Sequence, residues 1–209
     1  MSERLSPEEI DEAGLRDWRR MYHALQTRFR TGDFATGLQL VDAIGAAAEE
    51  ANHHPDLDLR YGHLNIRLYS HDVMGITARD LSLAEQISHL AAELDVEAAP
   101  AEVEAVELCL DTPDMARVKP FWRAIMGYHD NPEAEDEVRD DDADLPRIWF
   151  QASGSDEPRQ RFHIDVTVPP ELARGRIDAA VAGGGTVVDE QSSYVVLADP
   201  DGNRACVCF

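Results

Sequence analysis

Long apolar runs are missing from this sequence of 209 residues, and no uncharged apolar stretch approaches the roughly 20 residues needed to span a bilayer. The N-terminal segment MSERLSPEEIDE also lacks the basic and then apolar parts of a secretory signal peptide. These two absences argue against helical membrane spans and predict a cytoplasmic location.

Cysteine and basic residues are scarce. The three cysteines, Cys109, Cys206 and Cys208, include no CxxC pair, so we expect reduced, buried thiols rather than a disulfide framework. Lys and Arg number 19 against 41 Asp and Glu, which leaves a formal net charge of −22. Such a charge repels nucleic-acid backbones and anionic membranes, so neither is expected as a partner. We interpret the acidic run at 133–144 as a solvated loop rather than a metal site.

The length suits two domains of about 100 residues each. Small, acidic and proline-containing residues between the two halves, VEAAPAE, are typical of a linker. We therefore predict a first domain at 1–96, a linker at 97–102 and a second domain at 103–209.

Apolar periodicity in the first domain predicts the element order αββαββα, with helices on one face of an antiparallel four-stranded sheet. Two details carry this interpretation. A helix from Asp33 is expected to bury the stripe Phe34, Leu38, Val41, Gly45 and Ala48. A later hairpin is expected to turn at Gly62-His63 and to point its apolar side chains into one core: Leu57, Leu59, Tyr61, Leu64, Ile66 and Leu68.

The second domain shows two successive βαβββ patterns of similar length, an internal structural repeat that closes on a DPDGN hairpin at 199–203. The fold class is therefore α+β, with an antiparallel-sheet domain followed by a domain of paired βαβββ units.

Four of the eight histidines fall between 52 and 72, in NHHPDLDLRYGHLNIRLYSHD. His53 and His54 precede the first hairpin strand, and His71 follows the second. Because antiparallel strands return to their starting point, we expect His71 to lie near this pair and the three imidazoles to border one cavity. Such a cavity suits zinc or metal-free general acid and base catalysis. The alternative is a polar turn at the end of a helix with a surface histidine.

The stretch EEANHHPDLDLRYGHLNIRLYSHDVMGITARDLSLA resembles the pterin-4a-carbinolamine dehydratase family, through E-x-x-x-H-H-P followed by S/T-H and D, over about 5–95. The resemblance implies metal-free dehydration of a 4a-hydroxytetrahydropterin to a quinonoid dihydropterin. It also implies a homo-oligomeric enzyme that takes a reduced pterin and serves aromatic amino acid hydroxylases in tetrahydrobiopterin recycling. The functional positions it implies are Glu49, His53, His54, His71 and Asp80.

Imidazoles suit this chemistry because the leaving hydroxyl needs a proton while the N5 lone pair forms the C=N bond, and a nitrogen then loses a proton. We assign His54 and His71 to proton transfer and His53 to positioning of the pterin. Glu49 is expected to hold an imidazole tautomer. Asp80 has a competing explanation, because Thr77-x-x-Asp80 is also a capping-box pattern.

In the second half, DTPDMARVKPFWRAIMGY and VVLADPDGNRACVCF resemble the glyoxalase and vicinal-oxygen-chelate superfamily. This likeness spans about 103–209 and implies a concave site on the paired units. Glu107 and His163 occupy the first-strand ligand places of metal-dependent members, and Cys206 occupies the closing-strand place. Gln151 stands near the remaining place, so the zinc set is incomplete. We expect a metal-free ligand cleft that His163 and Asp165 line together with Glu107 and Cys206.

The sequence thus predicts a dehydratase domain fused to a glyoxalase-like domain of unknown ligand, with no cofactor and no metal. Two alternatives stay open. One is a non-catalytic pterin-binding or regulatory dimerisation protein. The other is a metal-dependent lyase or dioxygenase activity in the second half.

Overall fold

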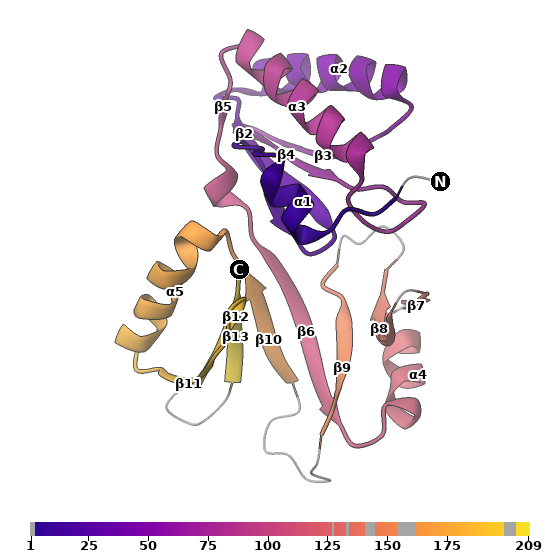
Figure 1. Ribbon diagram of the computed structural model, residues 1–209, viewed down its shortest axis with the longest axis vertical. Helices are drawn as coiled ribbons and strands as arrows, with labels where there is room; N and C mark the ends of the chain where they lie inside the picture. The colour runs from indigo at the N-terminus through magenta and orange to yellow at the C-terminus, as the bar shows by residue number, and fades with distance from the viewer. Residues whose placement is uncertain (1–2, 127, 133, 141–144, 154–161, 199–203) are drawn as a thin grey trace. The chain divides into compact units, whose positions relative to one another are not determined.

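The computed structural model describes residues 3–126, 128–132, 134–140, 145–153, 162–198 and 204–209 (Figure 1). The chain divides into two compact units, Met1–Val103 and Glu104–Phe209, each described below by itself. Within the described residues, every helix is too short or too polar to cross a membrane.

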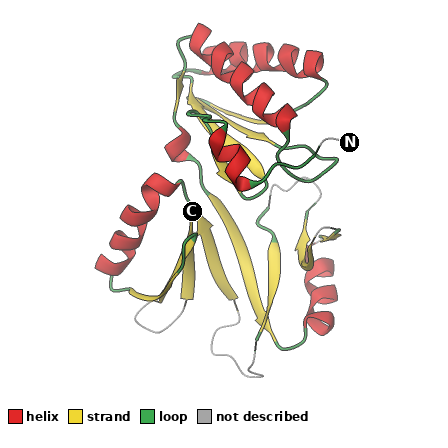
Figure 2. Cartoon of the chain, viewed as in Figure 1, coloured by secondary structure: helices red, strands yellow, loops and turns green. Residues whose placement is uncertain are grey.

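The first unit confirms the predicted order αββαββα. Its sheet has the strand order β1-β2-β4-β3, and every pair is antiparallel. Helices α2 and α3 lie side by side on one face of this sheet (Figure 2). The elements are α1 (Pro7–Glu12), β1 (Arg19–Met21), β2 (Ala24–Arg30), α2 (Phe34–Ala51), β3 (Asp56–Arg60), β4 (His63–Leu68), α3 (Ala78–Glu93), β5 (Glu97–Ala98) and the 3-10 turn η1 (Pro100–Glu102).

Helix α2 buries a different stripe from the predicted one. Phe34 is 46% exposed and Leu38 is 50% exposed. The buried face instead comprises Gly37, Leu40, Ile44, Ala47 and Ala48. Both stripes have helical spacing, so periodicity alone does not choose between them. Contact with the sheet selects the second stripe. Gly37 faces Leu59 on β3, and a side chain at position 37 would meet that leucine.

The β3–β4 hairpin turns one residue earlier than predicted. Arg60 pairs with His63, so the loop is Tyr61-Gly62. Tyr61 therefore lies in the turn, is 78% exposed and does not join the core as predicted. Leu64, Ile66 and Leu68 are buried as expected.

Part of the predicted linker at 97–102 is ordered secondary structure. Strand β5 pairs with β2 through Phe29↔Ala98 and Arg30↔Glu97. The turn η1 follows and places Glu102 beside the guanidinium of Arg30. The acidic, proline-containing composition of 97–102 suggested a linker. The segment is ordered because the edge of β2 offers backbone groups with which β5 can pair.

The second unit confirms the two predicted βαβββ repeats. The eight strands among its described residues form one mixed sheet of order β11-β12-β13-β10-β6-β9-β8-β7, in which β6 and β10 are antiparallel central neighbours. The elements are β6 (Ala105–Thr112), α4 (Met115–Met126), β7 (His129–Asn131), β8 (Ala134–Arg139), β9 (Ile148–Ala152), β10 (Phe162–Thr167), α5 (Pro170–Ala182), β11 (Thr186–Glu190), β12 (Tyr194–Ala198) and β13 (Arg204–Cys208).

The acidic run at 133–144 is not wholly a loop, because β8 lies within it and buries Val138 completely. Pairing with β7 and β9 outweighs the charge of its exposed residues.

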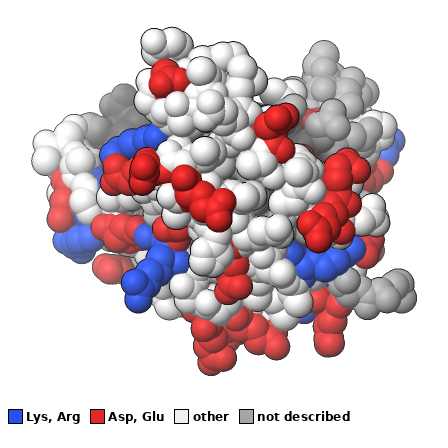
Figure 3. Space-filling view, turned by 90° about the horizontal axis from the view of Figure 1, so that it is seen from above, with Lys and Arg blue, Asp and Glu red and all other residues white. Residues whose placement is uncertain are grey.

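The DPDGN hairpin at 199–203 lies outside the described residues. On the face drawn in Figure 3, Lys and Arg lie among Asp and Glu side chains rather than in a separate basic patch.

Candidate functional site

The end of α2 places His53 in the interior of the first unit. Asn52 adopts a left-handed conformation with φ of 47° and ends the helix, and the backbone N–H of His53 donates to the carbonyl of Ala48 at 3.0 Å. His53 is 6% exposed. Its Nε2 lies 2.7 Å from Oδ1 of Asp80. Since a carboxylate oxygen accepts, His53 carries a proton on Nε2.

Asp80 is fully buried and accepts several hydrogen bonds at once. Its Oδ2 accepts from the Ser70 hydroxyl at 2.7 Å, and from the backbone N–H and hydroxyl of Thr77 at 2.8 and 3.0 Å. The capping box predicted for Thr77 and Asp80 is therefore present. One carboxylate both caps α3 and binds the imidazole of His53, so the two explanations hold together.

His54 and Glu49 form a second, exposed pair. The Nε2 of His54 lies 3.1 Å from Oε1 of Glu49, with side chains 57% and 81% exposed. Exposed pairs contribute little to stability. The carboxylate nevertheless holds one nitrogen of an imidazole that is open to solvent.

His71 lies in the turn closed by the bridge between Ser70 and Gly75, and it is exposed. Its ring centroid lies 4.2 Å from that of Tyr69. Ser70, its chain neighbour, donates to the same carboxylate that binds His53. Along the described chain no hydrogen bond or ring contact joins any two of His53, His54 and His71, so their convergence on one cavity stays a prediction.

Pairing in the second unit gathers polar side chains on one face of the sheet, because alternate residues of neighbouring strands share a face. His163 is paired with Cys109, and Cys109 with Trp149. Asp165 is paired with Cys206 on the other side. The opposite face packs apolar residues against α4 and α5.

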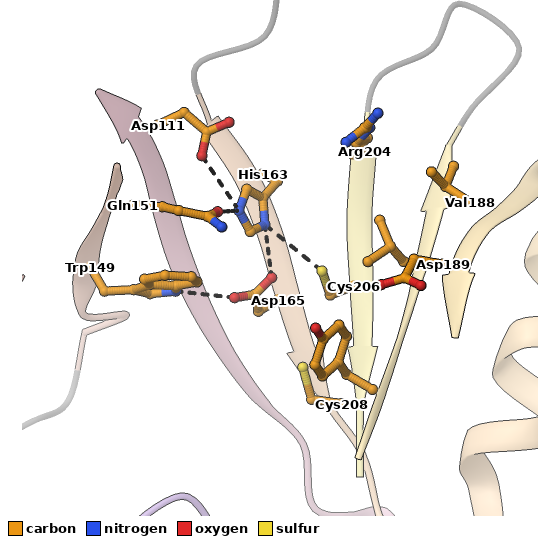
Figure 4. A pocket seen from close by; sticks show the side chains of 12 residues that line it. Asp111, Trp149, Gln151, His163, Asp165, Val188, Asp189, Arg204, Cys206 and Cys208 are labelled. Carbon is orange, nitrogen blue, oxygen red and sulfur yellow. Dashed lines mark hydrogen bonds and ion pairs between the residues drawn. The ribbon is translucent and has the colours of Figure 1, made fainter. Parts of the chain in front are cut away.

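His163 is the centre of this polar face (Figure 4). Its Nδ1 lies 2.9 Å from Oδ1 of Asp165, and its Nε2 lies 3.2 Å from Oε1 of Gln151. The other oxygen of Asp165, Oδ2, accepts from the indole N–H of Trp149 at 3.1 Å. Asp111 lies 4.0 Å from Nε2. Asp165 thus holds the imidazole of His163 through Nδ1, and the indole of Trp149 in turn holds Asp165.

A cavity of about 390 Å³ opens beside this imidazole. That volume is within the usual range for a small-molecule site. Its lining residues are Asp111, Trp149, Gln151, His163, Asp165, Val188, Asp189, Tyr194, Val196, Arg204, Cys206 and Cys208.

Glu107 does not line this cavity, contrary to our prediction. Its carboxylate forms an ion pair with Arg147, whose guanidinium also donates to Glu137 at 2.9 Å. Burial raises the pKa of Glu137, the second carboxyl of this group. Arg147 precedes β9, and its position next to β6 could not be inferred without the strand pairing.

Several potential metal ligands surround His163. Cys109 and Asp111 lie on one side of it, and Asp165 and Cys206 lie on the other. Burial, together with the negative charge of Asp165, raises the pKa of Cys206 to about 12 and holds the pKa of Cys109 far above its usual range. Both thiols are therefore protonated near neutral pH in the metal-free protein, and a metal that bound them would have to displace these protons.

Sequence reasoning missed several residues of both sites. Tyr69 next to His71 gave no motif signal of its own, and the S/T-H motif that contains Ser70 did not indicate its hydrogen bond to Asp80. Asp111 and Trp149 in the second unit share strand faces with residues we had singled out. Alternation along β6 and β9 was the signal that could have found them.

Comparisons with known proteins divide the chain in the same way. A family model described as pterin 4 alpha carbinolamine dehydratase matches residues 3–90, and one described as a glyoxalase-like domain matches 107–208. A provisionally named pterin-4-alpha-carbinolamine dehydratase of Thermosynechococcus vestitus is 40% identical over 93 residues, which are 44% of this chain and 98% of that protein.

Two solved structures are similar to the separate halves. The transcriptional coactivator/pterin dehydratase of Brucella melitensis matches with a TM-score of 0.41 and 27% identity, over 43% of this chain and 99% of that one. A glyoxalase/bleomycin resistance protein/dioxygenase superfamily member of Vibrio splendidus matches with a TM-score of 0.36 and 14% identity, over 51% and 98%.

Proposed function

We propose a dehydratase activity for this chain, which belongs to the pterin-4-alpha-carbinolamine dehydratase family through its first unit and carries a glyoxalase-like domain in its second. The proposed reaction converts a 4a-hydroxytetrahydropterin to a quinonoid dihydropterin and water. The substrate is a reduced pterin, and the tetrahydrobiopterin form is the one we propose to test first.

The hydrogen-bonded connection of His53, Asp80 and Ser70 supports this proposal most directly. The carboxylate of Asp80 binds the imidazole of His53 in the interior. It also accepts a hydrogen bond from Ser70, the residue directly before His71. A buried, fully hydrogen-bonded polar network of this kind specifies one arrangement of the groups attached to it.

In this mechanism the C4a–O bond breaks as a proton reaches the leaving oxygen, and the N5 lone pair forms the C=N bond. A base then takes the proton from nitrogen. We assign these transfers to His54 and His71, whose imidazoles are exposed. Glu49 holds the tautomer of His54, and His53 positions the pterin. No step requires a metal or a cofactor.

We extend the proposal to a homo-oligomer in the cytoplasm that returns the product of an aromatic amino acid hydroxylase to its cycle. The link to a hydroxylase follows from the chemistry of the proposed substrate, and the homo-oligomer follows from the family resemblance. This extension is independent of the assignment of the histidines.

The test is the rate at which enzymatically generated 4a-hydroxytetrahydropterin loses water, measured above the spontaneous rate. We expect His54→Ala and His71→Ala each to lower kcat about 10²- to 10⁴-fold, the usual contribution of general acid or base catalysis. His89→Ala is the matched control, because His89 is an exposed histidine of α3 outside the site. Wild-type rates in both variants would overturn the mechanism.

A wild-type protein that binds a reduced pterin without accelerating dehydration would instead support the non-catalytic alternative. Binding is measured by calorimetric titration with a stable tetrahydropterin. Such a result would leave the fold and family membership unchanged and remove the activity.

For the second unit we propose a cleft that binds a small polar molecule without a metal. The donor set fits a metal poorly. Glu107 is neutralised by Arg147, and both oxygens of Asp165 already accept hydrogen bonds. Gln151 supplies an amide where a carboxylate would favour a cation.

Elemental analysis of the purified protein and titration with Zn²⁺ test this part of the proposal. We expect the wild-type protein to bind no stoichiometric zinc at His163, so that His163→Ala leaves the measured zinc content unchanged. Zinc bound at one equivalent and lost in His163→Ala would support the metal-dependent lyase or dioxygenase alternative instead.

A further inference from the structure

We propose that Tyr69, supported by His23 and Arg67, is a positioning residue that fixes the imidazole ring of His71. The inference rests on the proposed dehydratase function. It concerns a group of residues in the first unit that none of the motif arguments had singled out.

Tyr69 and His71 stack on each other although only one of them is exposed. Their ring centroids are 4.2 Å apart with a tilt of 38°. Tyr69 is 2% exposed, whereas His71 is exposed. The buried ring therefore covers part of the imidazole and limits the rotamers that a surface side chain would otherwise sample.

Tyr69 is itself held by two further groups. The ring of His23 meets it edge-on at 5.1 Å and 82°, and the guanidinium carbon of Arg67 lies 4.7 Å from its centroid. Arg67 also makes a hydrogen bond of 2.9 Å with Nε2 of His23. Because a guanidinium only donates, Nε2 of His23 accepts, and His23 carries its proton on Nδ1.

The fold brings these residues together from two hairpins. Met21 pairs with Ala24, so His23 belongs to the two-residue loop between β1 and β2, where Tyr22 takes a φ of 56°. Pairing of Leu25 with Leu68 sets this loop beside the end of β4, which Tyr69 directly follows. The arrangement depends on the register of the sheet and not on neighbours in the sequence.

Such a stack acts on catalysis through His71 and does not touch the substrate. A proton-transfer group must be held close to the geometry of reaction, and small displacements are costly. Loss of the stack is therefore expected to lower kcat with little change in KM. A tyrosine that merely filled the core would affect stability instead.

Two substitutions at Tyr69 separate these roles. Tyr69→Leu keeps an apolar side chain and removes the ring, and we expect kcat to fall about 10- to 100-fold with KM nearly unchanged. Tyr69→Phe keeps the ring and is expected to restore most of kcat. In NMR spectra, the ring-current shift of the His71 protons should persist in Tyr69→Phe and vanish in Tyr69→Leu.

The outcomes distinguish the two proposals. An inactive wild-type protein would overturn the proposed function and the catalytic role of the stack with it. An active wild type with full kcat in a folded Tyr69→Leu protein would overturn this inference alone. If Tyr69→Leu fails to fold, His23→Ala replaces it. His23→Ala removes the edge-on contact and the acceptor of Arg67, and an unchanged kcat together with an unchanged His71 spectrum would then contradict the inference.

Discussion

The imidazole of His53 and the carboxylate of Asp80 meet at 2.7 Å although the two residues are 27 positions apart in the chain. His53 follows α2, and Asp80 lies in the first turn of α3. The contact therefore joins the end of one helix to the start of the next and holds both above the same sheet.

Asp80→Asn should destabilise the first unit. The amide has one acceptor oxygen and brings two donors toward groups that already donate, namely Ser70, Thr77 and His53. We expect the free energy of unfolding to fall by about 1.5–3 kcal/mol in urea denaturation, the range for hydrogen bonds to charged groups. Glu49→Gln, which alters an exposed carboxylate beside His54, is the control and should unfold almost as the wild type does. Equal stability of all three proteins would contradict the buried network.

Two glycines of α2 should respond in opposite directions to alanine. A Cβ at Gly37 would lie 2.5 Å from Leu59 Cδ1, whereas a Cβ at Gly45 would have nothing within 4 Å. We expect Gly37→Ala to lower the free energy of unfolding by about 1–3 kcal/mol through overpacking. Gly45→Ala should raise it by about 0.5–1 kcal/mol, because alanine favours the helix. Thermal unfolding of the pair checks both signs, and a stabilising Gly37→Ala would show that the Leu59 side chain rotates away from the added methyl group at little cost.

The cysteines of the second unit should react slowly with iodoacetamide at pH 8. Burial and the charge of Asp165 raise the pKa of Cys206 to about 12 and of Cys208 to about 11, so the reactive thiolate is rare in the folded protein. Mass spectrometry after brief labelling should find these two thiols unmodified in the native protein and modified in urea. Rapid labelling of the native protein would contradict the burial of this strand.

The same raised pKa values predict how stability depends on pH. Above the ordinary thiol pKa of about 9 the unfolded chain loses protons that the folded protein still holds. The unfolded state then binds fewer protons, so the free energy of unfolding falls as pH rises from about 9 toward 11 and 12. Replacing Cys206 and Cys208 with alanine should flatten this slope in denaturation curves recorded across that range. If the replacement leaves the slope of the free energy of unfolding against pH unchanged, that slope comes from other titratable groups.

Trp149→Phe should loosen His163 without emptying the core. The substitution keeps an aromatic ring and removes the indole N–H that donates to Asp165. We expect about 1–2 kcal/mol lower stability and a changed imidazole resonance for His163 in NMR spectra. Trp122→Phe is the matched control, since Trp122 packs against the core on the helix-covered face of the sheet. An imidazole signal unaffected by Trp149→Phe would show that Asp165 holds the ring alone.

Local pattern was sufficient for much of the fold. The αββαββα order and the two βαβββ repeats follow from alternation and helical spacing. The capping box of Thr77 and Asp80 was visible for the same reason, because its residues are three positions apart. Partners that are not consecutive in the chain, such as β2 with β4 and β6 with β10, come only from the structure. The buried face of each helix and the register of the paired strands were less predictable. Phe34 and Gly37 both belong to stripes with helical spacing, and only contact with β3 selected the second.

The sequence by itself determined which chemical groups this protein has and roughly where they stand along each strand and helix, because those properties depend on neighbours within a few residues. Tertiary structure alone decided that His53 meets Asp80, that Tyr69 stacks on His71, and that Glu107 pairs with Arg147 and leaves the cleft to His163. Each of these contacts joins residues on different elements, and the free energy that selects among such contacts comes from burial and pairing across the whole unit, which no local pattern encodes.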